Sequence, residues 1–532
     1  MRIVRIGIGD GPADSAPVDV VGAKAANLAR MAALGLPVPP AFVLPIELCA
    51  AVTRADSAAR QILADGLDEG IEFLEQATGK VFGDRRRPLL VSVRSGAARS
   101  MPGMLDTVLD VGCRPAAVRG LVRLTGNPRF ANDCRCRFLE SYGGVVLGID
   151  PAGFAERRNE LAAAEGLESD QALDGEALER LAAAYEELIE REDDALPEDP
   201  MEQLTAAAEA VYRSWMSDRA RTYRQLEQLE DLQGTAVTVQ AMVFGNSGNS
   251  SGAGVAFSRD PSTGTPEPVI DVLFGSQGED VVSGRRNPET EEAIVRSLPA
   301  VAAELRQALT RLEREFGDVQ DVEFTIDNGK LWLLQTRSAK RTPQAALRFA
   351  IDLVKEGRIA PVEALQRLKG VDLQTLASQR LVGAGMPVAR GAGASAGIAI
   401  GRAAFDSEGA AHLAASGDAV ILLRPNANTG DVAGFAASVG IVTAVGGRTA
   451  HAALVARQMG RPCIVGCRGL TIDLAHRRAS FAETAVDEGD WLSIDGEAGT
   501  VHLGKGQVAV ERPLAALAEI RRWQSELTEI TS

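Results

Sequence analysis

Cysteine is scarce in this sequence, and the few residues present form no recognisable site. None lies in a CxxC pair or at a metal-ligand spacing to a histidine; the six are Cys49, Cys113, Cys134, Cys136, Cys463 and Cys467. The pattern argues against a disulfide framework and against a zinc centre. We expect reduced thiols in a cytoplasmic protein.

Long apolar runs and an excess of positive charge are also missing. The amino terminus, MRIVRIGIGDG, alternates like a strand and lacks the apolar stretch of a signal peptide, and no run approaches the length of a membrane span. The formal net charge is −16, so the average surface repels nucleic acid and anionic lipid. We therefore expect neither a nucleic acid nor a membrane among the partners. A bound polyanion would need a few well-placed cations.

The composition that remains is that of a multidomain globular protein. The 532 residues exceed one ordinary core and predict two to four compact units. Apolar residues make up 45% of the chain and charged residues 24%, which is a typical globular balance.

The first half of the chain mixes helical and strand patterns. VGAKAANLARMAALG has helical apolar spacing up to Gly35 and places Lys24 in or near the first turn of a helix. LLVSVRSG has the pattern of a buried strand and carries Arg94 at its end. Residues from about 152 to 232 are rich in Ala, Glu, Leu and Arg with helical periodicity, which predicts a helical insert.

A hairpin follows in QDVEFTIDNGKLWLLQTR, and its turn decides which side chains share a face. A two-residue Asn-Gly turn would place Gln335 opposite Asp321 and Glu323, whereas a three-residue loop with Gly329 in the left-handed region puts all three on one face. We expect the three-residue loop. It also turns five apolar residues together onto the other, buried face: Val322, Phe324, Ile326, Trp332 and Leu334.

The second half changes character twice. Residues from about 341 to 385 have the pattern of connecting helices, and from Pro387 the chain is rich in Gly, Ala and Val with short predicted strands. Beyond Pro513, apolar residues at roughly helical spacing predict a terminal helix with an apolar stripe.

Histidine is also rare, and one of the four residues has an unusual setting. His451 lies in GGRTAHAALVARQMG, after a glycine turn and at the opening of an apolar-periodic helix, where backbone N–H groups favour a negative group. A neutral imidazole is a good nucleophile near pH 7. A capping or core histidine is the ordinary alternative. The other three, His412, His476 and His502, have no comparable glycine setting.

That segment resembles the phosphohistidine motif of the family that includes pyruvate phosphate dikinase and phosphoenolpyruvate synthase. Further matching segments occur in family order over nearly all of residues 1–510: VGAKAANLARMAALGLPVPPAF, VSVRSGAARSMPGMLDTVLDVG, AVTVQAMVFGN, GVAFSRDPSTG, SQGEDVVSG and QDVEFTIDNGKLWLLQTR. The stretch after Arg94 is similar to the dikinase version. The family usually has Ser where Ala450 stands, which leaves no hydroxyl contact at that position.

The resemblance implies a multidomain α/β and α+β fold. It predicts an ATP-grasp nucleotide-binding domain over residues 1–340, including the helical insert at about 152–232. A helical linker at 341–385, a swivelling phosphohistidine domain at 386–510 and a terminal helix at 511–532 would follow. We expect hinges near 341–345 and 384–390, because the phosphohistidine domain must move between sites.

The resemblance also implies roles for individual residues. It assigns Lys24 and Arg94 to the phosphates of ATP, and Asp321, Glu323 and Gln335 to Mg²⁺ and the nucleotide phosphates. It places Arg337 close to the transferring group. These roles agree with elementary chemistry, because Mg²⁺ prefers oxygen ligands and phosphoryl transfer depends on cations that neutralise the developing charge. Taken singly, each residue could instead be a solvated lysine, a structural ion pair or an exposed strand face.

Thr449, two residues before His451, matches a position that is phosphorylated for regulation in some family members. We favour a simpler interpretation, in which a helix N-terminal threonine satisfies a backbone donor.

The implied reaction uses ATP and inorganic phosphate, releases AMP and pyrophosphate, and leaves a phosphohistidine at His451 for transfer to pyruvate. In the family a TIM barrel binds pyruvate. Such a barrel needs about 250 residues, and only 22 follow residue 510, so we expect a separate barrel protein or another acceptor. Two alternatives remain open: a nucleotide-sensing regulatory protein without turnover, and a phosphotransferase acting on an unrelated small molecule.

Overall fold

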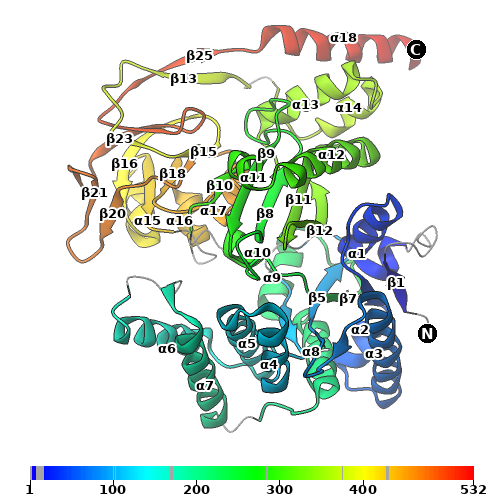
Figure 1. The fold of residues 1–532 in the computed structure, drawn as a ribbon. Coiled ribbons are helices and arrows are strands. Elements are labelled where there is room, and N and C mark those ends of the chain that lie inside the picture. Colours follow the sequence, from blue (N-terminus) through cyan, green and yellow to red (C-terminus); the bar gives the residue numbers. More distant parts are fainter. Residues whose placement is uncertain are drawn as a thin grey trace. The chain divides into compact units, whose positions relative to one another are not determined.

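The computed structural model describes residues 3–7, 17–99, 101, 104–167, 172–192, 195–282, 286–373, 376–426 and 431–531. The chain divides into two compact units, one of residues 1–249 with 332–336 and one of residues 250–331 with 337–532. Both contain helices and strands, so the predicted mixed α/β multidomain architecture is confirmed (Figure 1). No helix among the described residues is long and apolar enough to cross a membrane.

The first unit is built on a five-stranded antiparallel sheet in the order β1-β2-β7-β5-β6. Its strands β5 and β7 lie at the centre, and β7 is buried along its whole length. A parallel pair of two-residue strands, β3 and β4, lies apart from this sheet. The bounds are β1 Val4–Ile6, β2 Ala41–Leu44, β3 Val81–Phe82, β4 Pro88–Leu89, β5 Val91–Ala97, β6 Thr107–Val111 and β7 Thr235–Ala241.

Helices surround this sheet and share one apolar core with it. Two of them, α6 and α8, begin at an acidic N-cap followed by proline, and Asp150 and Asp199 each accept a backbone N–H of the first turn. The predicted helical stretch 152–232 contains α6 to α9. The bounds are α1 Val18–Ala33, α2 Leu48–Thr53, α3 Ser57–Thr78, α4 Pro115–Thr125, α5 Pro128–Tyr142, the π-helix η1 Gly143–Leu147, α6 Pro151–Ala164, α7 Gly175–Arg191, α8 Pro200–Ser214 and α9 Asp218–Leu226.

The second unit begins with the sheet β10-β9-β8-β11-β12. The long helix α12 packs on β11 through a buried apolar stripe that includes Leu305, Leu309 and Leu312. Residues 332–336 of β12 group with the first unit. The bounds are β8 Gly252–Phe257, β9 Val269–Phe274, β10 Glu289–Thr290, β11 Gln320–Asp327, β12 Lys330–Ser338, α10 Gly278–Val282, α11 Glu291–Ser297 and α12 Pro299–Phe316.

The turn between β11 and β12 has two residues, so the predicted three-residue loop is wrong. Asn328 and Gly329 both have positive φ, 49° and 77°, as a type I′ hairpin turn requires. Gly329 is left-handed as expected, but Asn328 tolerates that conformation too, and this shortens the loop.

The buried residues of β12 change accordingly. Leu331 and Leu333 are fully buried, whereas Trp332 and Leu334 are only half-buried. The argument that placed Gln335 on one face with the two carboxylates rested on the longer loop and falls with it.

An eight-stranded sheet follows in the order β14-β24-β23-β16-β17-β18-β19-β15, in which β16 to β19 run parallel. α17 connects β18 to β19, so the helix begins at the carboxyl edge of the parallel strands. A small meander of β20, β21 and β22 packs beside this sheet. The bounds are β14 Ala389–Arg390, β15 Ala392–Ser395, β16 Ile398–Ala404, α15 Ser407–Ala415, β17 Val420–Arg424, α16 Val432–Ala437, β18 Gly440–Thr443, α17 His451–Met459, β19 Cys463–Val465, β20 Leu470–Asp473, β21 Arg478–Phe481, β22 Thr484–Asp487, β23 Trp491–Asp495 and β24 Thr500–Leu503.

The predicted terminal helix, α18 (Leu514–Thr531), packs on α13 (Pro343–Lys355) and α14 (Pro361–Arg367) (Figure 1). Its apolar stripe is buried there through Leu517, Ile520 and Trp523. Two strands, β13 (Ser378–Val382) and β25 (Gln507–Glu511), pair as an antiparallel ribbon.

Residues 341–345 form several hydrogen bonds with Ser262 and Asp318, and the hinge expected near 341–345 stays a prediction. Arg341 donates from both terminal nitrogens to the carboxylate of Asp318, at 2.7 and 2.8 Å. The Thr342 hydroxyl donates to the Ser262 carbonyl at 2.6 Å and accepts from the backbone N–H of Ala345. The second predicted hinge, near 384–390, stays a prediction.

Candidate functional site

In the first unit, a close approach of two glycines brings Lys24 to the strand that carries Arg94. Gly22 interrupts α1 with φ 78° and ψ 160°. A Cβ atom at Gly22 would lie 2.0 Å from the carbonyl oxygen of Gly96, so only glycine fits there. An ideal Cβ at Gly96 would lie 3.9 Å from the Cβ of Lys24. The first turns of α1 therefore lie against the end of β5.

Arg94 is half-buried on β5 and donates to two glutamine side chains. The acceptors are Oε1 of Gln240, at 3.5 Å, and Oε1 of Gln335, at 3.4 Å. Gln240 is itself fixed, because its Nε2 donates to the carbonyl of Pro39. The two amide oxygens orient the guanidinium, and these long hydrogen bonds are weak enough to be exchanged for an anionic ligand.

In the second unit, Asp321 and Arg337 form a buried ion pair. Asp321 is 1% exposed, and its Oδ2 accepts from Arg337 Nε at 2.8 Å. Burial raises the pKa of Asp321, and Arg337 offsets only part of that rise. Burial acts to lower the pKa of Arg337, but the carboxylates of Asp321 and Glu323 bring it above its usual range.

The second carboxylate oxygen of Asp321 suits a cation. Oδ1 is buried and has no hydrogen-bond partner in the described structure. Glu323 is two residues further along β11, on the same face of the strand. Oxygen ligands of this kind fit Mg²⁺, which usually binds one or two carboxylates together with phosphate oxygens and water. No cluster of three or more His, Cys, Asp or Glu side chains among the described residues could hold a metal by itself.

The structure divides the predicted residues between the two units. Lys24, Arg94 and Gln335 belong to the first unit, and the remaining four, Asp321, Glu323, Arg337 and His451, belong to the second. The hydrogen bonds between predicted residues include that of Arg94 with Gln335 in the first unit and that of Asp321 with Arg337 in the second. A shared role of Gln335 with Asp321 and Glu323 at Mg²⁺ stays a prediction.

His451 opens α17, as the sequence predicts. The N-cap residue is Ala450, which supplies no side-chain cap, so the first N–H groups of the helix keep their preference for an anion. The preceding turn needs glycine, because a Cβ at Gly447 would lie 2.4 Å from Oδ2 of Asp271. Gly446 has φ 117° and donates its N–H to the side chain of Asn287.

Thr449 does not cap the helix, and that expectation was wrong. Its backbone N–H and its hydroxyl both donate to Oδ2 of Asp271, each at 3.1 Å. Both side chains are buried, at 2% and 4% exposure. Sequence reasoning missed Asp271, although a single acidic residue inside the apolar strand VIDVLF was a usable signal.

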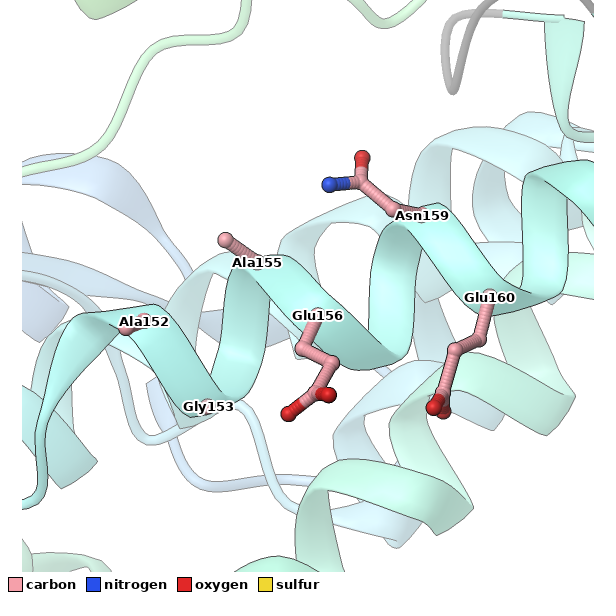
Figure 2. A pocket seen from close by; sticks show the side chains of 6 residues that line it. All are labelled: Ala152, Gly153, Ala155, Glu156, Asn159 and Glu160. Carbon is pink, nitrogen blue, oxygen red and sulfur yellow. The ribbon is translucent and has the colours of Figure 1, made fainter.

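A surface hollow of about 530 Å³ lies on α6 and contains none of the predicted residues. Figure 2 shows Glu156 and Glu160 on one side of the helix and Asn159 on the other. The six lining residues, Ala152, Gly153, Ala155, Glu156, Asn159 and Glu160, include no cation. An open acidic helix face is a poor site for a nucleotide.

Comparison with known proteins finds two family domains in the chain. Residues 60–302 and 292–357 match the pyruvate phosphate dikinase AMP/ATP-binding domain, and residues 417–499 match the mobile domain of PEP-utilising enzymes. His451 falls in the second match. The predicted fold class, an ATP-grasp nucleotide-binding domain followed by a phosphohistidine domain, is confirmed.

Several curated relatives are similar over almost the whole chain. Pyruvate, phosphate dikinase of Rhizobium meliloti (strain 1021) is 40% identical over 99% of this chain and 61% of its own length. Pyruvate, phosphate dikinase 1, chloroplastic, of Zea mays is 38% identical over 99% of this chain and 56% of its own length. The Arabidopsis thaliana protein of the same name is 40% identical over 96% and 53%. The chain thus spans less than two thirds of the length of these relatives.

Proposed function

The chain belongs to the pyruvate phosphate dikinase family, and from that premise we propose that it forms a phosphohistidine at His451 from ATP and inorganic phosphate. The imidazole attacks the β-phosphorus of ATP, the bond between the α- and β-phosphoryl groups breaks, and AMP leaves. Inorganic phosphate then takes the terminal phosphoryl group as pyrophosphate. A single phosphoryl group remains on His451.

The observation that carries this proposal is the state of Asp321. One of its oxygens is bonded to Arg337, and the other is buried without a hydrogen-bond partner beside Glu323. When bound, Mg²⁺ would neutralise charge on the phosphate oxygens. Arg337 supplies a fixed positive charge for the transferring group, because its carboxylate partners keep it protonated and oriented.

Lys24 and Arg94 supply two positive charges in the first unit. We propose that they grip the phosphates of ATP, with the guanidinium of Arg94 exchanging its weak glutamine contacts for phosphate oxygens. The overall charge of −16 makes such placed cations necessary.

The acceptor step extends the proposal. We expect transfer from His451 to pyruvate, with formation of phosphoenolpyruvate, or to another acceptor. The names of the relatives support pyruvate as the acceptor.

The test is incubation of the protein with Mg²⁺ and ATP labelled at the β-phosphate, with and without inorganic phosphate. We expect AMP release, acid-labile label on the protein, and pyrophosphate only when phosphate is present. His451→Ala should abolish the label. The matched control, His476→Ala, changes an exposed histidine and should label like the wild type.

Label that survives in His451→Ala would refute the phosphocarrier role. ATP binding without AMP release would instead favour a nucleotide-sensing protein. Adding pyruvate and following phosphoenolpyruvate then separates pyruvate from an unrelated small-molecule acceptor.

A further inference from the structure

Arg457 lies six residues after His451 on α17 and is completely enclosed. Its side chain is among the largest in the chain with less than 2% exposure. Nη1 donates to the carbonyl of Ala394 and Nη2 to the carbonyl of Arg448, both at 2.8 Å. The guanidinium thus joins two backbone segments, the first at Arg448 and the second at Ala394, which are 54 residues apart in the chain.

The first of these segments is the turn that leads into His451. Arg448 lies two residues before Ala450, the N-cap of α17, so a bond to its carbonyl fixes the chain at the entry of the helix. Gly446 and Gly447 restrict the backbone of this turn only weakly, because glycine has no side chain. The hydrogen bond from the Arg457 side chain therefore fixes the turn at whose end His451 begins the helix.

The second segment connects Arg457 to the nucleotide-binding part of the same unit. The carbonyl of Ala394 also accepts the Ser262 hydroxyl at 2.8 Å, and Ser262 lies in the loop between β8 and β9. The guanidinium carbon lies 5.2 Å from the ring centre of Phe257 on β8, within cation–π range. Arg457 therefore contacts both the turn before His451 and Phe257 on β8, whose partner in the neighbouring strand β11 is Asp321.

Burying the Arg457 guanidinium destabilises the folded state, so stability does not explain its presence. Burial lowers the pKa of Arg457 to about 10, although the carboxylates of Asp321, Asp260 and Asp271 favour its charge. Its Nε is buried without a hydrogen-bond partner in the described structure. An apolar residue of similar volume would fill this place without that cost.

We propose that Arg457 is a positioning residue for His451. It holds the turn 446–448 in place relative to β8, so that the imidazole reaches the nucleotide phosphates. The inference rests on the proposed phosphohistidine chemistry. It concerns a residue that touches neither nucleotide nor phosphoryl group, and it predicts a rate effect without an effect on nucleotide binding.

The experiment compares Arg457→Met, Arg457→Lys and the exposed control Arg468→Met. For each, the rate of label transfer from ATP to the protein, the equilibrium binding of ATP and the unfolding midpoint are measured. Arg457→Met should slow labelling on the order of 100-fold, as expected when reacting groups are displaced by about 1 Å, while ATP binding is unchanged. Arg457→Lys keeps the charge but lacks the two-pronged geometry, so it should restore part of the rate. Arg468→Met should match the wild type.

Phe257→Leu covers the case in which Arg457→Met does not fold. It leaves both carbonyl bonds in place and removes the ring face, so labelling should slow by roughly three- to tenfold, corresponding to a cation–π contribution of about 1 kcal/mol. Wild-type rates in both Arg457→Lys and Phe257→Leu would overturn the inference. Rates that fall only in proportion to lost ATP binding would overturn it too. Absence of label on the wild-type protein would instead count against the proposed function itself.

Discussion

One oxygen of Asp271 accepts both the backbone N–H and the hydroxyl of Thr449, at 3.1 Å each. The two residues are 178 positions apart in the chain, and both are buried. Asp271 lies on β9, and Thr449 lies two residues before His451. The contact therefore ties the start of the helix that bears His451 to the nucleotide-binding part of the second unit.

Removing one of these two hydrogen bonds should have a measurable cost. Thr449→Val keeps the volume of the side chain and the backbone bond but removes the hydroxyl donor, and we expect the free energy of unfolding to fall by about 1 kcal/mol. Thr449→Ser retains a hydroxyl and serves as the control, with a smaller effect. In an Asp271→Ala background, Thr449→Val should have almost no further effect on stability in urea unfolding. Additive losses would contradict the pairing.

The ionisation of Asp271 should make the stability of the protein depend on pH in a defined direction. Burial raises its pKa in the folded protein above the ordinary value of 3.8, so the folded state holds this proton more tightly than the unfolded state does. Stability from this group is therefore fully present below pH 3.8 and is lost as pH rises through the raised folded pKa.

Asp271→Asn isolates this contribution, because asparagine cannot ionise. The difference in unfolding free energy, wild type minus Asp271→Asn, should decrease from pH 3.8 upward and level off above the raised pKa. Other carboxylates affect both proteins equally and cancel in the difference. A difference that increases with pH over that range would mean that the carboxylate is stabilised, not destabilised, by its surroundings.

Asp321 and Glu323 should determine how much Mg²⁺ the reaction requires. Asp321→Asn keeps the shape of the side chain but weakens the buried oxygen as a cation ligand, so AMP release should need more Mg²⁺ for half-maximal rate. Glu323→Gln should act in the same direction. We expect each rate at fixed Mg²⁺ to fall by about 100-fold, the usual loss when one electrostatic contact to a reacting group is removed.

The control for these variants is Glu304→Gln on the exposed side of α12, which removes one negative charge from the same unit. Its Mg²⁺ titration should overlay that of the wild type. If the Mg²⁺ titrations of Asp321→Asn and Glu323→Gln also overlay that of the wild type, the two carboxylates do not hold the cation.

Local chemistry explains which parts of the site could be predicted from sequence. The position of His451 at the start of α17 and the end of α1 near Gly35 follow from residues within a few positions, and both are confirmed. The hairpin turn is also local, but it was predicted wrongly because Asn328 shares the left-handed preference that was given to Gly329 alone.

For the long-range pairings the sequence offers no sign of the partner, and only the acidic residue within VIDVLF points to a buried charge. The bond of Thr449 to Asp271 spans 178 positions, and the bond of Arg457 to Ala394 spans 63. Each residue also has a good local role, as a helix N-terminal threonine or a helix arginine, and a single sequence gives no reason to reject that role. Burial of the charged partner is what identifies them, and burial is a property of the folded chain.

The approach of α1 to β5 gives the last prediction. Gly22→Ala places a methyl group 2.0 Å from the Gly96 carbonyl and also imposes an unfavourable φ of 78°. Gly35→Ala is the control for a positive φ alone, since its φ is 70° and a Cβ there meets nothing within 4 Å, whereas Gly22 also has ψ 160°. We expect Gly35→Ala to cost about 1 kcal/mol, the ordinary penalty for a left-handed alanine, and Gly22→Ala to cost about 2 kcal/mol more in urea unfolding. Relief of the clash should move Lys24 away from β5, so ATP binding should weaken in Gly22→Ala alone. Equal losses in the two variants would show that φ strain, and not the close approach to Gly96, fixes glycine at this position.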